Sequence, residues 1–211
     1  QTVFRARLLN ENLTEELLNA DAEKELSAPP RAKTKAGRMN VEFIPAFYAA
    51  FSEATAIAEI RPSIGDNIAV GEFTLLSPLK VFDFTAFDNA RQNDSFTDEE
   101  KNSCYQHTRY KFITEMQNEI SRPITPYQKN LEYIPTQIVA EYLKEHFSCD
   151  AVIYKSSMHK EHSKEARNIV IFNNGESFAS NNNESLKFLK HNIREISNVT
   201  YDIEEPLSFP F

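Results

Sequence analysis

The chain has 211 residues and a mass of 24.2 kDa, which is enough to bury a full hydrophobic core in one domain. Its 31 acidic and 23 basic side chains give a formal net charge of −8. This charge argues against general nucleic-acid binding, because such proteins need a basic surface to displace counterions. No apolar run approaches the length of a membrane span, and two cysteines without a metal-type spacing indicate a reducing cytoplasm. The N-terminus has neither Met nor an apolar signal-peptide core, so an upstream segment stays an open question.

Hydrophobic periodicity predicts a mixture of helices and short strands, in which consecutive strands pair antiparallel more often than through βαβ units. The expected strands are Thr2–Leu9, Phe47–Ala50, Ile68–Leu75, Lys80–Thr85, Ala151–Tyr154 and Asn168–Phe172, with one or two closing strands between Ile193 and Ile203. The expected helices are Thr14–Asn19, Glu53–Glu59, a long helix from a capping box at Thr97–Glu100 to about Ile120, and Thr136–Phe147. The last of these has Ile138, Val139, Tyr142 and Leu143 as its expected buried stripe.

Two arginines, Arg5 and Arg7, share one face of the first expected strand. A solvated face is the simple interpretation. A sharper one is a guanidinium pair that binds an anion, since the planar fork of Arg matches phosphate oxygens. Glycine is scarce in the chain, so Gly37 directly before Arg38 indicates a turn that the backbone needs.

The second expected helix carries a carboxylate in an unusual setting. Ser52 is a good N-cap for this helix, and Glu59 shares a face with Thr55 and Ala56 at helical spacing. These small neighbours leave room for a ligand to approach Glu59. A structural ion pair between Arg38 and Glu59 is the competing interpretation, and on chemistry alone it is the commoner arrangement.

Several other chemistries lack their signals. His159 and His162 have a ligand-like spacing, but they lie in a Lys- and Glu-rich loop without a fixed third ligand, so no metal site is predicted. The chain has no Gly-x-Ser-x-Gly elbow and no phosphate-cradling Gly-rich loop, and Cys104 and Cys149 have no obvious His partner. The remaining set of Arg, Tyr and Glu suits a phosphate-bearing ligand whose reaction passes through a sugar cation.

These residues carry a resemblance to a known family. Gly37-Arg38-Met39-Asn40, then Tyr48, then Thr55-Ala-Ile-Ala-Glu59 resembles the core signature of the RES domain family. Further stretches that resemble the family are Phe4–Arg7, Val81–Phe84, Tyr133–Tyr142, and Tyr154–Ser157 followed by Asn168–Phe172. The resemblance covers residues 2 to about 172, and it looks like the longer variants of the family.

The resemblance implies an α+β fold similar to that of the ADP-ribosyltransferases, with two small, mostly antiparallel sheets and flanking helices around an NAD cleft. It implies a single domain over residues 1–211, in which residues 173–211 are a C-terminal extension. Many members are toxins of toxin–antitoxin pairs that destroy NAD by phosphorolysis or hydrolysis. The implied reaction is cleavage of the nicotinamide–ribose bond of NAD, with inorganic phosphate or water as acceptor, no metal, and an antitoxin protein as a further partner. A protein ADP-ribosyltransferase and a non-catalytic nucleotide-binding module stay open as alternatives.

The resemblance also implies roles for individual residues. Arg38, Tyr48 and Glu59 are the implied catalytic residues, with Glu59 stabilising the ribosyl cation and Tyr48 packing on the nicotinamide side. Arg5 and Arg38 are implied to hold the phosphates or ribose of NAD. Ser156 is implied to bond the ligand, and Asn168 to support the site. Two choices stay open, because Arg7 could take the place of Arg5 and Ser157 that of Ser156.

Overall fold

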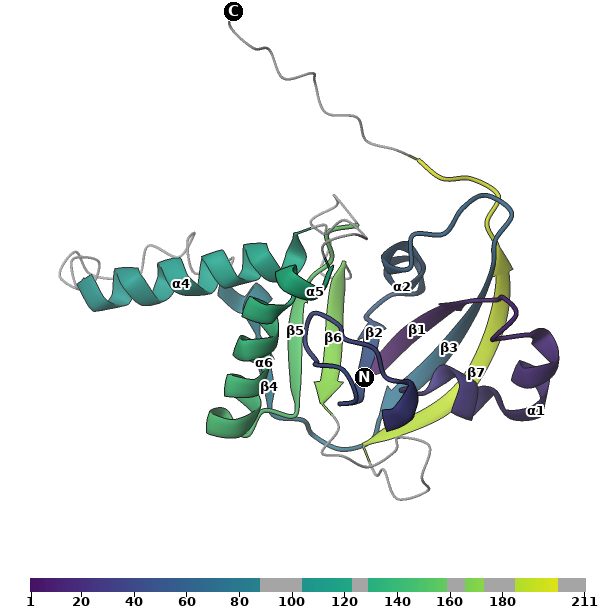
Figure 1. Cartoon of the computed structure of the whole chain (residues 1–211), viewed down its shortest axis with the longest axis horizontal. Coiled ribbons are helices and arrows are strands. Elements are labelled where there is room, and N and C mark those ends of the chain that lie inside the picture. The colour runs from purple at the N-terminus through teal and green to yellow at the C-terminus, as the bar shows by residue number, and fades with distance from the viewer. Residues whose placement is uncertain (88–103, 123–128, 159–165, 173–184, 201–211) are drawn as a thin grey trace, which may run out of the picture.

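The computed structural model describes residues 1–87, 104–122, 129–158, 166–172 and 185–200 (Figure 1). Seven strands form one sheet in the order β4-β5-β6-β2-β1-β3-β7. They are β1 (Thr2–Leu8), β2 (Ala46–Ala50), β3 (Asn67–Leu75), β4 (Val81–Asp83), β5 (Ala151–Lys155), β6 (Arg167–Phe172) and β7 (Leu186–Glu195). Neighbouring strands are antiparallel except β4 and β5, which are parallel. The expected mixture of α and β structure with mostly antiparallel pairing is confirmed.

The sheet has a narrow joint between β1 and β2. These strands share the single register pair Phe4–Ala50, whereas β1 pairs with β3 along its whole length. The expectation of two small sheets therefore differs from the described structure, which has one sheet. Its two halves, β4-β5-β6-β2 and β1-β3-β7, stay hydrogen-bonded through that one pair. The ADP-ribosyltransferase-like arrangement stays a prediction.

The helices are α1 (Glu15–Leu26), α2 (Glu53–Glu59), α4 (Cys104–Ser121), α5 (Lys129–Glu132) and α6 (Ile134–Phe147), with 3-10 turns at Arg31–Lys33 and Phe84–Phe87. Figure 1 shows α4 and α6 beside the half of the sheet that contains β5 and β6, and α1 beside the half that contains β3 and β7. None of the described helices is long and apolar enough to cross a membrane.

An apolar core lies on each face of the sheet. The core under α1 contains Leu18, Leu26, Val3, Phe47, Phe73 and Ile169, among others. The core under α4 and α6 contains Ile120, Ala140, Leu143, Val152 and Val170, among others. Ile169 and Val170 are neighbours on β6 and enter different cores, because successive side chains of a strand point to opposite faces. Burial on both faces explains why β5 and β6 are continuous apolar runs in the sequence.

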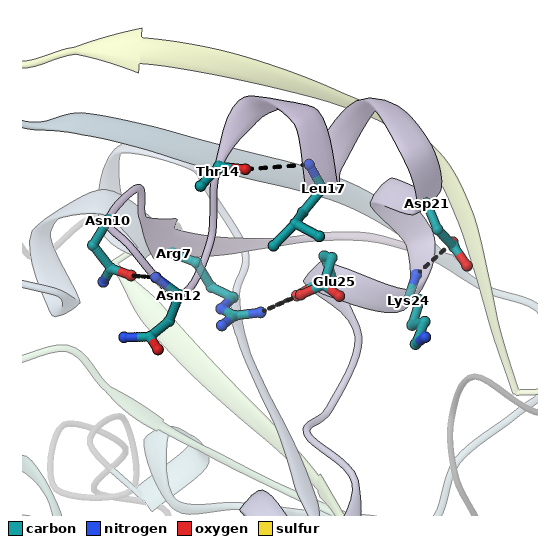
Figure 2. A network of polar contacts seen from close by, with 8 residues as sticks. All are labelled: Arg7, Asn10, Asn12, Thr14, Leu17, Asp21, Lys24 and Glu25. Carbon is teal, nitrogen blue, oxygen red and sulfur yellow. Dashed lines mark hydrogen bonds and ion pairs between the residues drawn. The ribbon is translucent and has the colours of Figure 1, made fainter.

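Helix α1 is longer than the sequence predicts and is kinked. Thr14 caps its start by accepting a bond from the amide of Leu17 at 3.4 Å. Asp21 has a non-helical backbone (φ −160°), and its carboxylate accepts a bond from the amide of Lys24 at 3.0 Å, which restarts the helix (Figure 2). Because a polar side chain caps each segment, the polar composition of this stretch is compatible with a helix that a hydrophobic pattern alone misses.

Several other boundaries differ from the prediction. The strand expected at Lys80–Thr85 is confirmed only over Val81–Asp83, because Asp83 accepts bonds from both the amide and the hydroxyl of Thr85 and so begins a 3-10 turn. The closing strand is β7, which pairs with β3 earlier in the chain than expected. The capping box at Thr97–Glu100 lies outside the described residues.

Helix α6 is turned relative to its expected orientation. Ile138 and Tyr142, expected to be buried, are 64% and 53% exposed; the expected burial of Leu143 is confirmed, and Thr136 and Ala140 are buried as well. Thr136 can be buried because its hydroxyl lies 2.7 Å from the main-chain carbonyl of Arg38 and 3.0 Å from that of Tyr133. Thr136, a polar residue with partners inside the protein, is thus buried on α6, whereas Ile138, which the apolar pattern predicts to be buried, is exposed.

Candidate functional site

A pocket of about 230 Å³ lies between α2 and the strands β1, β2, β5 and β6. Its lining combines small and aromatic residues with three strongly polar side chains. The lining residues are Phe4, Arg5, Ala6, Tyr48, Ala49, Ala50, Ala56, Glu59, Ile60, Tyr154 and Asn168. Figure 1 shows α2 above β1 and β2, at the joint between the two halves of the sheet.

One row of strand partners crosses the pocket. Phe4 of β1 pairs with Ala50 of β2, Ala50 pairs with Asn168 of β6, and Asn168 pairs with Tyr154 of β5. Cross-strand partners project to the same face of a sheet. The register of four strands therefore brings together residues that are far apart in the sequence, and all four line the pocket.

The carboxylate of Glu59 is held from the opposite side of the pocket. Its Oε1 accepts a bond of 2.6 Å from the hydroxyl of Ser156 and one of 2.7 Å from the side-chain amide of Asn168. Both donors are buried, whereas Glu59 is exposed. Short bonds to a carboxylate are among the stronger hydrogen bonds in proteins. Both of these bonds reach Oε1, and among the described residues none reaches Oε2.

Ser156 is itself fixed by the backbone. Its amide donates to the carbonyl of Ala166 at 3.0 Å, and its hydroxyl accepts a bond from the amide of Met158 at 3.2 Å. The one hydroxyl proton of Ser156 is used on Glu59. Of the two serines that the sequence left open, Ser156 is therefore the one that contacts the pocket carboxylate. Its contact with a ligand stays a prediction.

Arg5 lines the pocket and bridges the joint between β1 and β2. Its Nη1 donates to the main-chain carbonyl of Tyr48 at 3.0 Å, and its guanidinium lies 5.4 Å from the centre of the Phe47 ring. Its Nε is buried and has no hydrogen-bond partner among the residues that the structure describes. Burial, reinforced by the positive charge of Arg7, lowers the pKa of Arg5 to about 10, so the side chain still carries its charge at pH 7. A buried cation with an unused donor favours an anionic ligand.

Arg7 has a different environment. Its guanidinium contacts the main-chain carbonyl of Glu25 and lies 3.6 Å from the carboxylate of the same residue (Figure 2). This contact fastens the end of β1 to α1. Of the two arginines on the first strand, only Arg5 lines the pocket.

Tyr48 contributes its ring to the pocket wall, while its hydroxyl is bonded elsewhere. The hydroxyl donates to Asn40 Oδ1 at 2.7 Å and accepts a bond from the amide of Met39 at 3.0 Å. Burial raises the pKa of Tyr48, and burial together with the negative charge of Glu59 raises the pKa of Tyr154. Both phenols are therefore protonated at neutral pH.

Arg38 lies near the site but does not line the pocket. Its guanidinium donates to the carbonyl of Glu119 at 3.2 Å, contacts the carbonyl of Arg122, and lies 5.8 Å from the centre of the Tyr133 ring. A cation at the end of α4 is favourable because the last carbonyls of the helix, among them that of Glu119, carry the negative end of the helix dipole. Arg38 and Glu59 form no ion pair with each other in the described structure, so that competing interpretation is wrong.

Several functional candidates carry no signal of their own in the sequence. Tyr154 is one, although it lies two residues before Ser156 and pairs with Asn168. Asn40 is another, since in the sequence it is only the end of the motif that begins at Gly37. Within the described residues no group of three or more His, Cys, Asp or Glu side chains could hold a metal ion, and the His159–His162 pair lies outside them.

Comparison with known proteins gives one match. A family model described as the RES domain matches residues 16–191, which run from α1 into β7. The matched range includes Arg38, Tyr48, Glu59 and both donors to the Glu59 carboxylate, whereas Arg5 lies before it. Neither a curated protein nor a solved structure matches the chain.

Proposed function

Because the chain belongs to the RES domain family, which is associated with NAD-related toxin–antitoxin systems, we propose that it is a toxin enzyme that consumes NAD. The proposed reaction cleaves the nicotinamide–ribose bond by phosphorolysis or hydrolysis. The observation that carries this proposal is the Glu59 carboxylate, fixed through one oxygen by Ser156 and Asn168 in a pocket that also contains the charged Arg5.

The proposed reaction suits a site that contains a fixed carboxylate. When the bond between the ribose carbon and the ring nitrogen breaks, its electron pair leaves with nicotinamide, whose ring becomes neutral. Positive charge then develops on the ribose. The negative charge of Glu59 stabilises that cation, and because the carboxylate is already oriented, it does not have to reorganise during the reaction.

The acceptor completes the reaction in one of two ways. Attack by water yields ADP-ribose and releases a proton to solvent, whereas attack by inorganic phosphate yields ADP-ribose carrying a phosphate on the same ribose carbon. In both cases a new carbon–oxygen bond replaces the bond to nicotinamide. We assign Arg5 to the anionic part of NAD, because this buried cation lines the pocket and its Nε has no hydrogen-bond partner among the described residues.

The roles of the other residues remain part of the proposal. The Tyr48 ring packs against the nicotinamide side of the substrate, and Arg38 contributes to phosphate or ribose binding. Ser156 and Asn168 act by holding Glu59. An antitoxin protein as partner and the reducing cytoplasm as compartment are also proposed, on the association of the family with toxin–antitoxin systems.

Replacing Glu59 by Gln tests the proposal directly. Gln keeps an oxygen that can accept the bonds from Ser156 and Asn168 but removes the negative charge. We expect nicotinamide release from NAD to fall by about 10²–10³-fold, the usual effect of losing one preorganised electrostatic group. The purified protein is incubated with NAD, with and without phosphate, and the ribosyl product is identified. Growth inhibition on expression should disappear with the same substitution.

The exposed Glu42→Gln variant is the matched control, since it removes one negative charge away from the pocket. Nicotinamide release at the wild-type rate from Glu59→Gln would show that Glu59 does not stabilise the reaction. ADP-ribose found attached to protein would identify a protein ADP-ribosyltransferase. Absence of release from the wild-type protein in every condition would indicate a non-catalytic nucleotide-binding module.

A further inference from the structure

The hydroxyl of Tyr48 is enclosed by the turn Gly37–Asn40. Besides its bonds to Asn40 and to the Met39 amide, it faces Gly37, where an added Cβ would lie 2.5 Å from the hydroxyl oxygen. Such a Cβ would also lie 2.6 Å from Asn40 Oδ1. The lack of a side chain at Gly37 therefore permits the turn to close around the phenol. The single hydroxyl proton is used, and the turn covers the oxygen.

Asn40 connects this hydroxyl to the rest of the turn. Its side chain is buried, and its amide nitrogen lies within hydrogen-bonding distance, 3.0–3.1 Å, of the carbonyls of Lys35, Val41 and Ile44, which share its two N–H donors. These bonds fix the direction of Oδ1, which accepts the bond from Tyr48 at 2.7 Å. The amide cannot turn away from the phenol without losing partners inside the protein.

Side chains of helix α6 also bind the turn Gly37–Asn40. The side-chain amide of Gln137 donates to the carbonyls of Gly37 and Asn40 at 2.8 and 2.9 Å, and the Thr136 hydroxyl lies 2.7 Å from the carbonyl of Arg38. The turn therefore has little freedom to move relative to α6. It provides a rigid support for the Tyr48 hydroxyl, which the turn binds.

We infer that Asn40 is a positioning residue for the pocket, acting through Tyr48, and that the Tyr48 hydroxyl takes no part in proton transfer. Asn40 fixes the hydroxyl end of the ring, so the ring stays in the pocket wall. The main-chain carbonyl of Tyr48 accepts a bond of 3.0 Å from Arg5. The Asn40–Tyr48 hydrogen bond thus helps to fix an aromatic surface of the pocket. This inference rests on the proposed function, because its test uses NAD as the ligand.

The test compares Asn40→Ala, Tyr48→Phe and the double variant with the wild-type protein. Each single variant should raise the KM for NAD by about tenfold, which corresponds to roughly 1.4 kcal/mol, a typical effect of one lost internal hydrogen bond. The kcat for nicotinamide release should change by less than about threefold, and its pH profile should keep its shape. The double variant should resemble Asn40→Ala, because that substitution already removes the shared Tyr48–Asn40 bond together with the bonds from Asn40 to backbone carbonyls.

Asn12→Ala and Tyr142→Phe are matched controls at exposed positions and should leave KM unchanged. Tyr48→Phe removes only one oxygen and should fold. Its pH profile of kcat therefore decides the question even if Asn40→Ala folds poorly. A loss of kcat in Tyr48→Phe together with the loss of one limb of the profile would show that the hydroxyl transfers a proton. Effects that multiply in the double variant, or single variants with wild-type KM, would also overturn the inference.

Binding of NAD, measured by calorimetry, separates this inference from the proposed function. A wild-type protein that binds NAD without releasing nicotinamide overturns the proposed reaction alone, and the tenfold loss then appears in the dissociation constant of each variant. An active wild-type protein with an altered Tyr48→Phe pH profile overturns the inference alone. A wild-type protein that neither binds nor cleaves NAD overturns both.

Discussion

Tyr154 links the pocket to the pH dependence of stability. Its side chain is buried, and burial together with the charge of Glu59 raises its pKa well above the ordinary value of 10.0. An acid whose pKa is raised by folding contributes stability that is fully present below pH 10. That stability is lost as the pH rises toward the pKa of the folded state, because the unfolded chain then releases a proton that the folded protein retains.

The Tyr154→Phe variant tests this linkage. Above pH 10, Tyr154 should contribute less to the free energy of unfolding of the wild-type protein as the pH rises. The expected fall is about 1.4 kcal/mol per pH unit. The variant should lack that contribution and lose stability more gradually. Denaturant titrations between pH 8 and 11 measure the two slopes. The exposed Tyr142→Phe variant should keep the wild-type slope, and equal slopes for Tyr154→Phe and wild type would contradict the prediction.

At the scale of a single element, α2 is short and depends on its cap. The Ser52 hydroxyl accepts a bond from the Thr55 amide at 3.2 Å and lies 2.8 Å from the Thr55 hydroxyl. Isolated helices of this length do not form in water, so capping and tertiary packing hold α2 in place. Its last residue is Glu59, and the position of the carboxylate therefore depends on the integrity of the whole helix.

Replacing Ser52 by Ala should lower the free energy of unfolding by about 1 kcal/mol, because the first turn of α2 loses a side-chain acceptor. Urea titration measures the shift of the midpoint. Ser52→Asp is the matched control, since Asp is an equally good N-cap and should preserve most of the stability. An Ala variant as stable as the wild-type protein, or an Asp variant as unstable as the Ala variant, would argue that the cap does not hold α2.

At the scale of the whole molecule, β2 and β6 join the two cores. Phe47 faces the core under α1, where its ring packs edge to face against Phe73 with centroids 4.9 Å apart. Ala46 on the same strand faces the core under α4 and α6. Because each of these strands belongs to both cores, we propose that the chain folds as a single cooperative domain, despite the narrow joint between β1 and β2.

Phe47→Ala should lower the free energy of unfolding by about 3–5 kcal/mol, the usual cost of removing a buried aromatic ring. Circular dichroism and tyrosine fluorescence should report one common transition in both the wild-type protein and the variant. The control is Phe112→Ala, because that ring is exposed on α4 and its loss should change stability by less than about 0.5 kcal/mol. Two separated transitions would indicate that the halves of the sheet unfold independently.

Local signals predicted much of the chain. The N-cap at Ser52 and the bounds of α2 are as expected, and the apolar runs of β2, β5 and β6 are confirmed within one or two residues. Capping and strand propensity depend on neighbours in the sequence, so they can be recognised there. The motif from Gly37 to Glu59 also indicated the family, which the match over residues 16–191 confirms.

Relations between distant segments were decided by the tertiary structure. Arg5 and Arg7 are equivalent in the sequence, and only the packing of α1 against the end of β1 gives Arg7 a carboxylate partner and leaves Arg5 in the pocket. The orientation of α6 depended on a partner for Thr136, the carbonyl of Arg38, which lies 98 residues earlier in the chain. The sequence alone thus determined the capped helix α2, the apolar strands β2, β5 and β6, and the family motif that contains Glu59. The tertiary structure decided which residues meet, because hydrogen-bond partners and strand register across the sheet are properties of the folded chain.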